Sequence, residues 1–156
     1  MTTVRGLTAA DVAAVQEMVL EFGAYLNALG DSWRHNFTAE KYLADGFGPN
    51  PAFRGFIAEK DGAALGYLLM APNYDVDLGM RIEIVIDLWV GAKARRSGAG
   101  RALMDAAADA ARRSGARQLL WSVYRPNRLA RDFYLAIGGK EVADLDWMYL
   151  PLDDMI

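Results

Sequence analysis

The sequence predicts one α/β domain, in which a twisted mixed sheet of about six to seven strands carries helices on both faces. Three features predict this fold class. Apolar residues recur at helical spacing between positions 12 and 26. Three apolar runs separated by turn signals follow over residues 53–90, which is the pattern of antiparallel hairpins. Helix and strand patterns then alternate from residue 101 to residue 150, and such alternation requires crossover connections.

The N-terminal third is predicted to be mostly helical. After a short strand at Thr3–Arg5, Thr8 is expected to cap a helix, with Asp11 in capping-box position. A second, short helix is predicted to begin after Thr38 and to end near Asp45-Gly46. The first helix carries an apolar stripe that faces the core, formed by Val12, Val15, Val19, Phe22 and Leu26.

The centre of the chain is predicted to form an antiparallel meander. Phe53–Glu59 and Ala64–Ala71 are expected to be two strands joined by Asp61-Gly62, a strong hairpin signal. Pro72–Gly79 is predicted to be a longer polar turn, and Arg81–Val90 a long strand. Three consecutive β-branched residues within this last strand are typical of a strand that is covered on both faces.

The C-terminal third is predicted to alternate helices and strands. Arg101–Ser114 has the clearest helical pattern, and Gly115 is expected to close this helix in the left-handed conformation. Gln118–Tyr124 is predicted to be an apolar strand and Arg128–Ile137 a further helix. Two closing strands are expected at Lys140–Val142 and Trp147–Leu150. Because no linker or change in composition divides the chain, residues 1–156 are expected to form a single domain.

The composition excludes several classes of function. The chain has 20 acidic and 17 basic residues, so its net charge of −3 predicts no general attraction to nucleic acid or to an anionic membrane. It contains no cysteine, which excludes disulfides, cysteine zinc sites and thiolate nucleophiles. This composition agrees with a cytoplasmic location. The sequence shows no metal-ligand spacing, so we expect no metal site.

The stretch most informative about function runs from Asp87 to Met104, where a strand leads through a loop with Gly98 and Gly100 into a helix. The first turn of a helix has free backbone N–H groups and the positive end of the helix dipole. Arg95, Arg96 and Arg101 add positive charge. Together these features predict a cradle for an anion such as a pyrophosphate.

Two other phosphate-binding loops do not match this stretch. A dinucleotide fingerprint requires a third glycine or an alanine at position 103, where the chain has Leu103. A Walker A loop requires Gly-Lys-Ser/Thr, which the stretch lacks. A tight turn with solvated arginines stays open as the structural alternative.

Two motifs in this order resemble the GNAT superfamily of N-acetyltransferases. Arg95-x-x-Gly98-x-Gly100 is similar to its acetyl-CoA loop, and the segment from Asn127 through Ala130, Phe133 and Tyr134 to Gly138 is similar to its Asn-x-x-Ala-x-x-Phe-Tyr-x-x-x-Gly segment. The resemblance covers nearly the whole chain and implies a GNAT-like fold. It also implies acetyl-CoA as the acyl donor.

A closer group is suggested by a third segment. Leu43-Ala-Asp45-Gly-Phe47-Gly48 resembles the spermidine/spermine (diamine) acetyltransferases. Those enzymes have Glu-Asp on the central strand, where this chain has Ile86-Asp87. The departure removes an acidic residue thought to help deprotonate polyamines, and so puts polyamine specificity in doubt.

The resemblance implies which residues bind the cofactor. Backbone N–H groups from Arg96 to Arg101 would hold the pyrophosphate, and the central strand would pair with the pantetheine arm and polarise the thioester carbonyl. Asn127 would hydrogen-bond the same arm, or cap the following helix, or do both. The implied cofactor-binding residues are Leu88, Trp89, Val90, Arg95, Arg96, Ser97, Gly98, Ala99, Gly100, Arg101, Asn127, Ala130 and Phe133. The alternative for Leu88, Trp89 and Val90 is a plain core strand.

Three residues are candidates for proton transfer. By its place in the motif, Tyr134 would act as general acid and protonate the thiolate leaving group, the alternative being a tyrosine that only packs its ring. Glu83 and Asp87 are four residues apart on one strand, so both are expected on the same face, where either could deprotonate the amine. A carboxylate paired with an arginine, or capping a backbone N–H group, is the structural alternative for each.

These observations predict an N-acetyltransferase that acts on a primary amine of a small molecule. Because the chain has no cysteine, no thioester-linked acetyl-enzyme can form, and direct attack in a ternary complex is the simplest mechanism. A protein or peptide N-acetyltransferase and a non-catalytic acyl-CoA-binding sensor stay open as alternatives. The resemblance also implies a homodimer.

Overall fold

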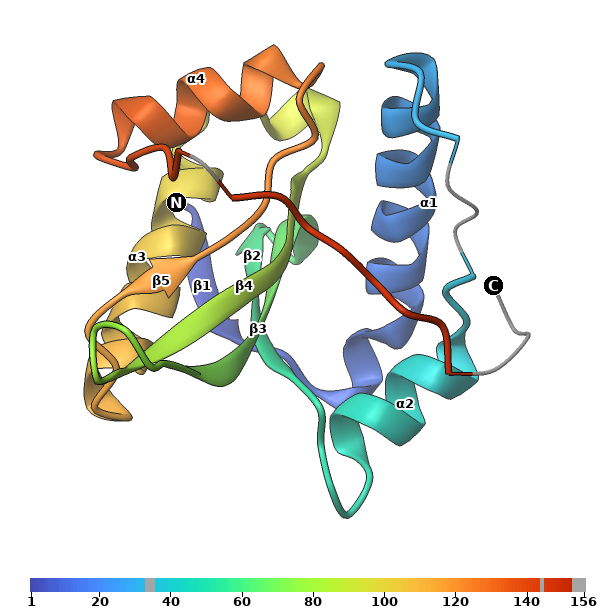
Figure 1. The fold of residues 1–156 in the computed structure, drawn as a ribbon. Coiled ribbons are helices and arrows are strands. Elements are labelled where there is room, and N and C mark those ends of the chain that lie inside the picture. The colour runs from blue at the N-terminus through green and yellow to red at the C-terminus, as the bar shows by residue number, and fades with distance from the viewer. Residues whose placement is uncertain (33–35, 144, 153–156) are drawn as a thin grey trace.

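The computed structural model describes residues 1–32, 36–143 and 145–152. Within these residues five strands form one mixed sheet in the order β1-β2-β3-β4-β5 (Figure 1). The first four strands pair in antiparallel fashion, whereas β4 and β5 are parallel. The strands are β1 (Thr3–Gly6), β2 (Arg54–Lys60), β3 (Ala63–Asp75), β4 (Met80–Val90) and β5 (Leu119–Leu120).

Helices cover both faces of the sheet, as predicted (Figure 1). On one face lie α1 (Val12–Ala28) and α2 (Ala39–Phe47), and α1 packs on β3 and β4. On the other face α3 (Ala99–Arg113) packs on β1 to β4. The side chains of α4 (Arg128–Ala136) join the core on the α3 side.

The core therefore has two parts that are separated by the sheet. In β3, Tyr67 and Leu69 face α1, whereas Leu68 and Met70 face α3, as the period of two in a strand requires. The α3 side includes four alanines of that helix, whose small side chains let it lie close to the sheet: Ala99, Ala107, Ala110 and Ala111. The buried residues on the α1 side are Val15, Met18, Tyr42, Ile57, Tyr67, Leu69 and Trp89.

The predicted capping box at the first helix is present and belongs to a larger polar cluster. The Thr8 backbone N–H group donates to Asp11 Oδ2 at 2.7 Å. Both terminal nitrogens of Arg5 donate to the same carboxylate, at 2.9 and 2.7 Å, and Arg5 Nη2 also contacts Glu59 Oε1 at 2.7 Å. The Arg5 hydrogen bonds are the largest cause that lowers the pKa of Asp11 to about 2. The cluster ties β1, the start of the first helix and β2 together.

The turn predicted at Pro72–Gly79 is shorter than expected. β3 continues to Asp75 and pairs with the first residues of β4, so that only residues 76–79 form the turn. β2 begins opposite Met70, so among the described residues the part of β3 after Met70 has no partner on its β2 side. At Pro72 β3 is therefore an edge strand. A proline is tolerated there because an edge strand needs no N–H donor on its open side.

The prediction of six to seven strands is not confirmed. Lys140–Val142 and Trp147–Leu150 have no strand pairing, and the predicted strand Gln118–Tyr124 is reduced to Leu119–Leu120. Alternation of apolar residues makes a strand only where a neighbouring backbone is available. In Figure 1 the chain after α4 instead runs across the open side of the molecule toward α2.

A β-bulge in β4 shapes the site. Asp87 pairs with Leu69 and Val85 with Met70, so Ile86 is an extra residue with no partner on β3. One extra residue reverses the alternation of the side chains that follow it. As a result Val85 faces α3, whereas Asp87 and Trp89 face α1.

Candidate active site

A cavity opens where β4 and β5 separate. The two strands pair only at Glu83–Leu119 and Ile84–Leu120, and beyond this point residues 85–90 and residues 121–124 diverge. They line a cavity of about 800 Å³ that also reaches α1, α4 and the start of α3. The backbone of β4 therefore faces an open space on its β5 side.

One end of the cavity is the loop before α3, which has the geometry of an anion cradle. Arg96 and Gly98 both have positive φ, 62° and 88°, so the backbone turns sharply into the helix. Consecutive N–H groups in such a turn point toward a common centre. A Cβ atom on Gly100 would lie 3.3 Å from Cζ of Phe133, so glycine allows α3 and α4 to lie close together here. Arg96, Gly98, Gly100 and Arg101 all line the cavity.

Ser97 and Ala99 support this loop without lining the cavity. The Ser97 hydroxyl donates to the Ala94 carbonyl oxygen at 2.6 Å and accepts from the Ala99 N–H group at 3.4 Å. The Ala99 side chain is buried in the α3 side of the core. Any contribution of these two residues to ligand binding therefore comes from their backbone.

Arg95 lies over aromatic rings of the α1 side. Its guanidinium carbon is 4.9 Å from the ring centre of Tyr25 and 4.8 Å from that of Trp89. Trp89 in turn stacks on Phe22 of α1 at 4.9 Å and donates from Nε1 to Glu21 Oε2 at 3.3 Å. These contacts fix α1 against the end of β4 and so set the width of the cavity. The side chains of Leu88 and Val90 pack on the α3 side, as the core-strand alternative predicts.

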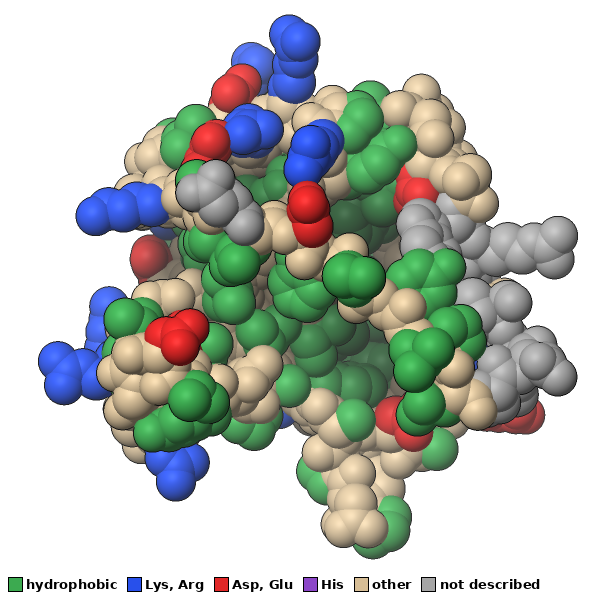
Figure 2. All heavy atoms as spheres, viewed as in Figure 1, with side chains coloured by type: hydrophobic (Ala, Val, Ile, Leu, Met, Phe, Trp, Pro, Cys, Tyr) green, Lys and Arg blue, Asp and Glu red, His purple; other side chains and the backbone are tan. Residues whose placement is uncertain are grey.

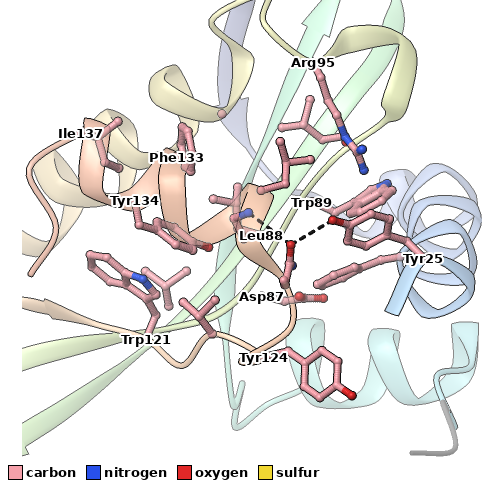
Figure 3. Close-up of a pocket in the computed structure, with 18 of the residues that line it drawn as sticks. Tyr25, Asp87, Leu88, Trp89, Arg95, Trp121, Tyr124, Phe133, Tyr134 and Ile137 are labelled. Atoms are coloured by element: carbon pink, nitrogen blue, oxygen red, sulfur yellow. Dashed lines mark hydrogen bonds between the residues drawn. The ribbon is translucent and has the colours of Figure 1, made fainter. Parts of the chain in front are cut away.

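Asn127 is buried and caps α4. Its Oδ1 atom accepts from the Ala130 N–H group at 3.2 Å and from the Tyr25 hydroxyl at 2.9 Å. The second bond links the start of α4 to α1 across the cavity, as the dashed line to Tyr25 in Figure 3 shows. The capping role considered for Asn127 is therefore present in the structure.

Tyr134 places a protonated phenol in the cavity. Its ring lies between Trp121 and Phe133, with ring centres 4.9 and 5.2 Å away, and its hydroxyl points toward β4 near Leu88 (Figure 3). Burial, and secondarily the negative charge of Asp87, raise the pKa of Tyr134 to about 12. The group therefore holds its proton at every physiological pH, as a general acid must before the reaction.

Asp87 enters the cavity from the α1 side, and Glu83 does not enter it. The buried hydroxyl of Tyr67 donates to Asp87 Oδ2, and burial raises the pKa of Tyr67 well above its usual range. Glu83 is only 1% exposed; its Oε1 atom accepts from Arg54 Nη2 at 2.7 Å and from the Ser114 hydroxyl at 2.8 Å. The prediction that both carboxylates share one face is wrong, because the bulge at Ile86 reverses the alternation between them.

Comparison with known proteins identifies the family. The acetyltransferase (GNAT) family profile matches residues 22–138. The chain belongs to this family. It is a GNAT-type N-acetyltransferase, and the resemblance seen in its sequence motifs is confirmed.

Two relatives illustrate the range of similarity. The uncharacterized N-acetyltransferase YhfO of Bacillus subtilis (strain 168) is 38% identical over 85 residues, which are 54% of this chain and 57% of that protein. The match thus spans little more than half of that relative's length. The thialysine N-epsilon-acetyltransferase of Sus scrofa is 26% identical over 144 residues, covering 87% of this chain and 82% of that protein.

Solved structures share the fold of this acetyltransferase. An integron cassette protein of V. cholerae, VCH_CASS6, has a TM-score of 0.77 at 19% identity, over 96% of this chain and 92% of that chain. The aminoglycoside acetyltransferase meta-AAC0020 from an uncultured soil sample, in complex with sisomicin, has a TM-score of 0.76 at 16% identity, over 97% of both chains. At such low identities the likeness concerns the fold alone. Among the residues that the structure of this acetyltransferase describes, no helix is long and apolar enough to cross a membrane.

Most residues predicted from the sequence lie together in the cavity of this acetyltransferase. Those that line it are Asp87, Leu88, Trp89, Val90, Arg95, Arg96, Gly98, Gly100, Arg101, Asn127, Ala130, Phe133 and Tyr134. Sequence reasoning missed Tyr25, Trp121 and Tyr124, which also line it, and Tyr67 behind Asp87. Tyr67 has the sequence signature of an ordinary core strand residue, and only its hydrogen bond to Asp87 sets it apart. Trp121 and Tyr124 were assigned to the predicted strand Gln118–Tyr124, of which the structure pairs only Leu119–Leu120.

Proposed function

We propose that this acetyltransferase uses acetyl-CoA to acetylate a primary amine of a small molecule, by direct attack within a ternary complex. The observation that carries the proposal is that one cavity joins a helix N-terminus suited to anions, the phenol of Tyr134 and the carboxylate of Asp87. Acetyl-CoA supplies an acetyl thioester and the phosphate groups that such a helix terminus binds.

The residues around the cavity suit this donor. The first N–H groups of α3 have no intrahelical acceptor, and Arg96 and Arg101 line the cavity at the same end, so this end would hold a pyrophosphate. Among the described residues, no strand pairs with Leu88–Val90 on the β5 side of β4. An extended arm could therefore add to β4 like a further strand. The apolar walls at Phe133 and Leu129 would exclude water from it.

Two groups of the chain are placed to move the protons that amide formation requires. An acceptor that binds as an ammonium loses two protons as the C–N bond forms and the C–S bond breaks; the departing sulfur gains one proton and the other passes to solvent. Asp87, held by Tyr67, would bind the ammonium and accept its proton directly or through water. Tyr134 would donate its phenol proton to the sulfur. The two groups are close enough for the charge of Asp87 to raise the pKa of Tyr134.

Relatives support a small amine as the acceptor. The name of the relative from Sus scrofa states that it acetylates the ε-nitrogen of thialysine, a primary amine on a small molecule. That match covers most of both chains, whereas the higher identity to YhfO covers only about half. We therefore favour a small amine over a protein acceptor.

The proposal is tested by two measurements on the purified protein. Calorimetry measures whether acetyl-CoA binds, and release of free thiol is followed with polyamines, diamines, amino acids, lysine analogues, aminoglycosides and short peptides. Binding, together with rapid thiol release for one class of small amine, is the expected result. Binding without release from any small amine would instead indicate a protein acceptor or a sensor. Absence of binding would contradict the proposal altogether.

We further propose that the protein is a homodimer in the cytoplasm, with the C-terminal segment in the interface. This segment is extended and strongly apolar, and its side chains at Trp147, Met148 and Leu150 are 74%, 93% and 83% exposed. Surfaces of this kind are commonly covered by another chain. Sedimentation of a dimer at micromolar concentration is expected, and a monomer at that concentration would contradict the proposal.

A further inference from the structure

We propose that the acceptor is a primary amine carried on an apolar or aromatic body, with one positive charge and no second ammonium. This inference rests on the proposed function and adds the chemical class of the acceptor. It is carried by the charges and apolar surfaces at the end of the cavity that lies away from the anion cradle.

The charges along the cavity are unevenly distributed. Arg95, Arg96 and Arg101 lie at the end formed by the loop and the start of α3. In Figure 3 Arg95 marks that end and Tyr124 the opposite one, with Asp87 and Tyr134 between them. Among the described residues that line the cavity, Asp87 is the sole carboxylate. The acceptor end therefore offers one counter-charge for one ammonium group.

The surface beyond Asp87 is apolar. The bulge turns Ile86 outward, where its side chain is 50% exposed and lines the cavity, although isoleucine is usually buried. Phe22 and Leu26 of α1 and Tyr124 after β5 line the same cavity. Figure 2 shows a deep hollow on this face with hydrophobic side chains in its interior and charged ones mainly around it. An apolar acceptor body would cover this exposed surface.

A second ammonium group would be unfavourable at this end. An acceptor with its reactive nitrogen at Asp87 places its remaining atoms against Ile86 and its apolar neighbours. An ammonium group moved from water to such a surface loses hydration. The described lining residues provide no second carboxylate whose ion pair with the ammonium could compensate for this loss. An uncharged alkyl chain end against the same surface gains from burial instead.

The test compares two acceptors that differ only at the far end, pentylamine and 1,5-diaminopentane. Phenethylamine is included as an aromatic monoamine. We expect kcat/KM for pentylamine to exceed that for the diamine by about ten-fold or more, even though the diamine has two equivalent amino groups. Phenethylamine is expected to equal or exceed pentylamine because its ring buries more apolar surface. A diamine that reacts as well as pentylamine, or better, would overturn the inference.

A single substitution tests whether Ile86 sets this preference. Ile86→Glu adds a second carboxylate at the apolar end, and its half-exposed side chain makes the change tolerable for folding. The loss of apolar contact and the gain of an ion pair are expected to shift the ratio of the two kcat/KM values toward the diamine by about ten-fold. Leu20→Glu is the matched control, because Leu20 is 60% exposed on α1 and does not line the cavity. The ratio should be unchanged in this control, and an equal shift in both variants would overturn the role of Ile86.

Failure of the inference can be told apart from failure of the proposed function. If acetyl-CoA binds and diamines react preferentially, the enzyme is a small-amine acetyltransferase and only the inferred acceptor class is wrong. If acetyl-CoA binds and none of the three amines releases thiol, the inferred class is equally wrong. If acetyl-CoA does not bind, the proposed function fails first.

Discussion

Replacing Tyr134 by phenylalanine separates the proposed proton transfer from the packing of the ring. Phenylalanine keeps the contacts with Trp121 and Phe133, at ring-centre distances of 4.9 and 5.2 Å, so the shape of the cavity is preserved. The lost hydroxyl is the proposed proton donor to sulfur. A positioned general acid contributes about 100-fold to 10,000-fold, so we expect kcat to fall at least 100-fold. The dissociation constant of acetyl-CoA is expected to change by less than about three-fold, because the phenol acts on the leaving group only during the reaction.

The dependence of this defect on pH is the sharper measurement. Since burial and the charge of Asp87 raise the pKa of Tyr134 to about 12, the phenol keeps its proton between pH 7 and pH 10. The ratio of wild-type to variant kcat should therefore be constant over this range. Tyr74→Phe is the matched control, because Tyr74 is 56% exposed and does not line the cavity. Unchanged turnover in Tyr134→Phe at every pH would refute the general-acid assignment, whereas a ratio that falls toward one by pH 10 would refute the raised pKa of Tyr134.

The same pKa predicts a readout that needs no substrate. Above pH 10 an unfolded chain loses the tyrosine proton, whereas the folded protein keeps the proton of Tyr134 until about pH 12. The unfolded state then binds fewer protons, so the free energy of unfolding falls as pH rises through this interval. Two pKa units correspond to about 3 kcal/mol, and Tyr134→Phe should remove that part of the fall in denaturant titrations. An identical fall in both proteins would contradict the raised pKa.

Three further substitutions, the first with a matched control, test other parts of the structure. Gly98→Ala should weaken acetyl-CoA binding measured by calorimetry, because the φ angle of Gly98, 88°, disfavours a residue with a side chain. Gly115→Ala is the control: Gly115 follows α3 and has a φ of 82°, so this change should lower the melting temperature and leave binding unchanged. Asp11→Asn should reduce the free energy of unfolding by about 1–2 kcal/mol at pH 7. The difference should disappear as pH falls through about 2, where the wild-type carboxyl becomes protonated. Glu83→Gln should lower the melting temperature through its lost ion pair with Arg54 but retain kcat, and a collapse of kcat in the folded variant would restore Glu83 as a base.

Local and periodic patterns in the sequence predicted the elements that frame the site. Two helices lie within two residues of their predicted positions: the one with the apolar stripe from Val12 to Leu26 and the one predicted at Arg101–Ser114. They were predictable because apolar side chains recur on the buried face of a helix. The glycine loop was likewise predictable, since Gly98 adopts the left-handed conformation that its residue type favours. These features depend on residues that are close in sequence, so no knowledge of the remaining fold is required.

Features that depend on distant partners could not be predicted in the same way. A bulge adds one residue to a strand, and Ile84-Val85-Ile86 contains no glycine or proline to mark it. The prediction that Glu83 and Asp87 lie on the same face of the strand was therefore wrong. The apolar run at Trp147–Leu150 suggested a strand, but pairing depends on a free sheet edge, which the sequence does not reveal. The position of Arg95 over Tyr25 and Trp89 likewise joins segments that are 70 and 6 residues apart.

The bulge and the separation of β4 from β5 act together to bring the proposed acid and the proposed base to one place. Tyr134 belongs to the α3 side of the sheet and Asp87 to the α1 side, and an intact pair of strands would place the sheet backbone between two such side chains. Because β4 and β5 diverge after Ile84, the cavity passes through the sheet at this level. Because Ile86 is an extra residue, Asp87 faces α1, where an acceptor can reach it without crossing the cofactor side. The arrangement would admit the two proposed substrates from opposite faces, and it lets the charge of Asp87 act on the proton of Tyr134. If Asp87 accepts the proton of the amine as proposed, its charge is lost, so the pKa of Tyr134 would fall at the stage when its own proton is required.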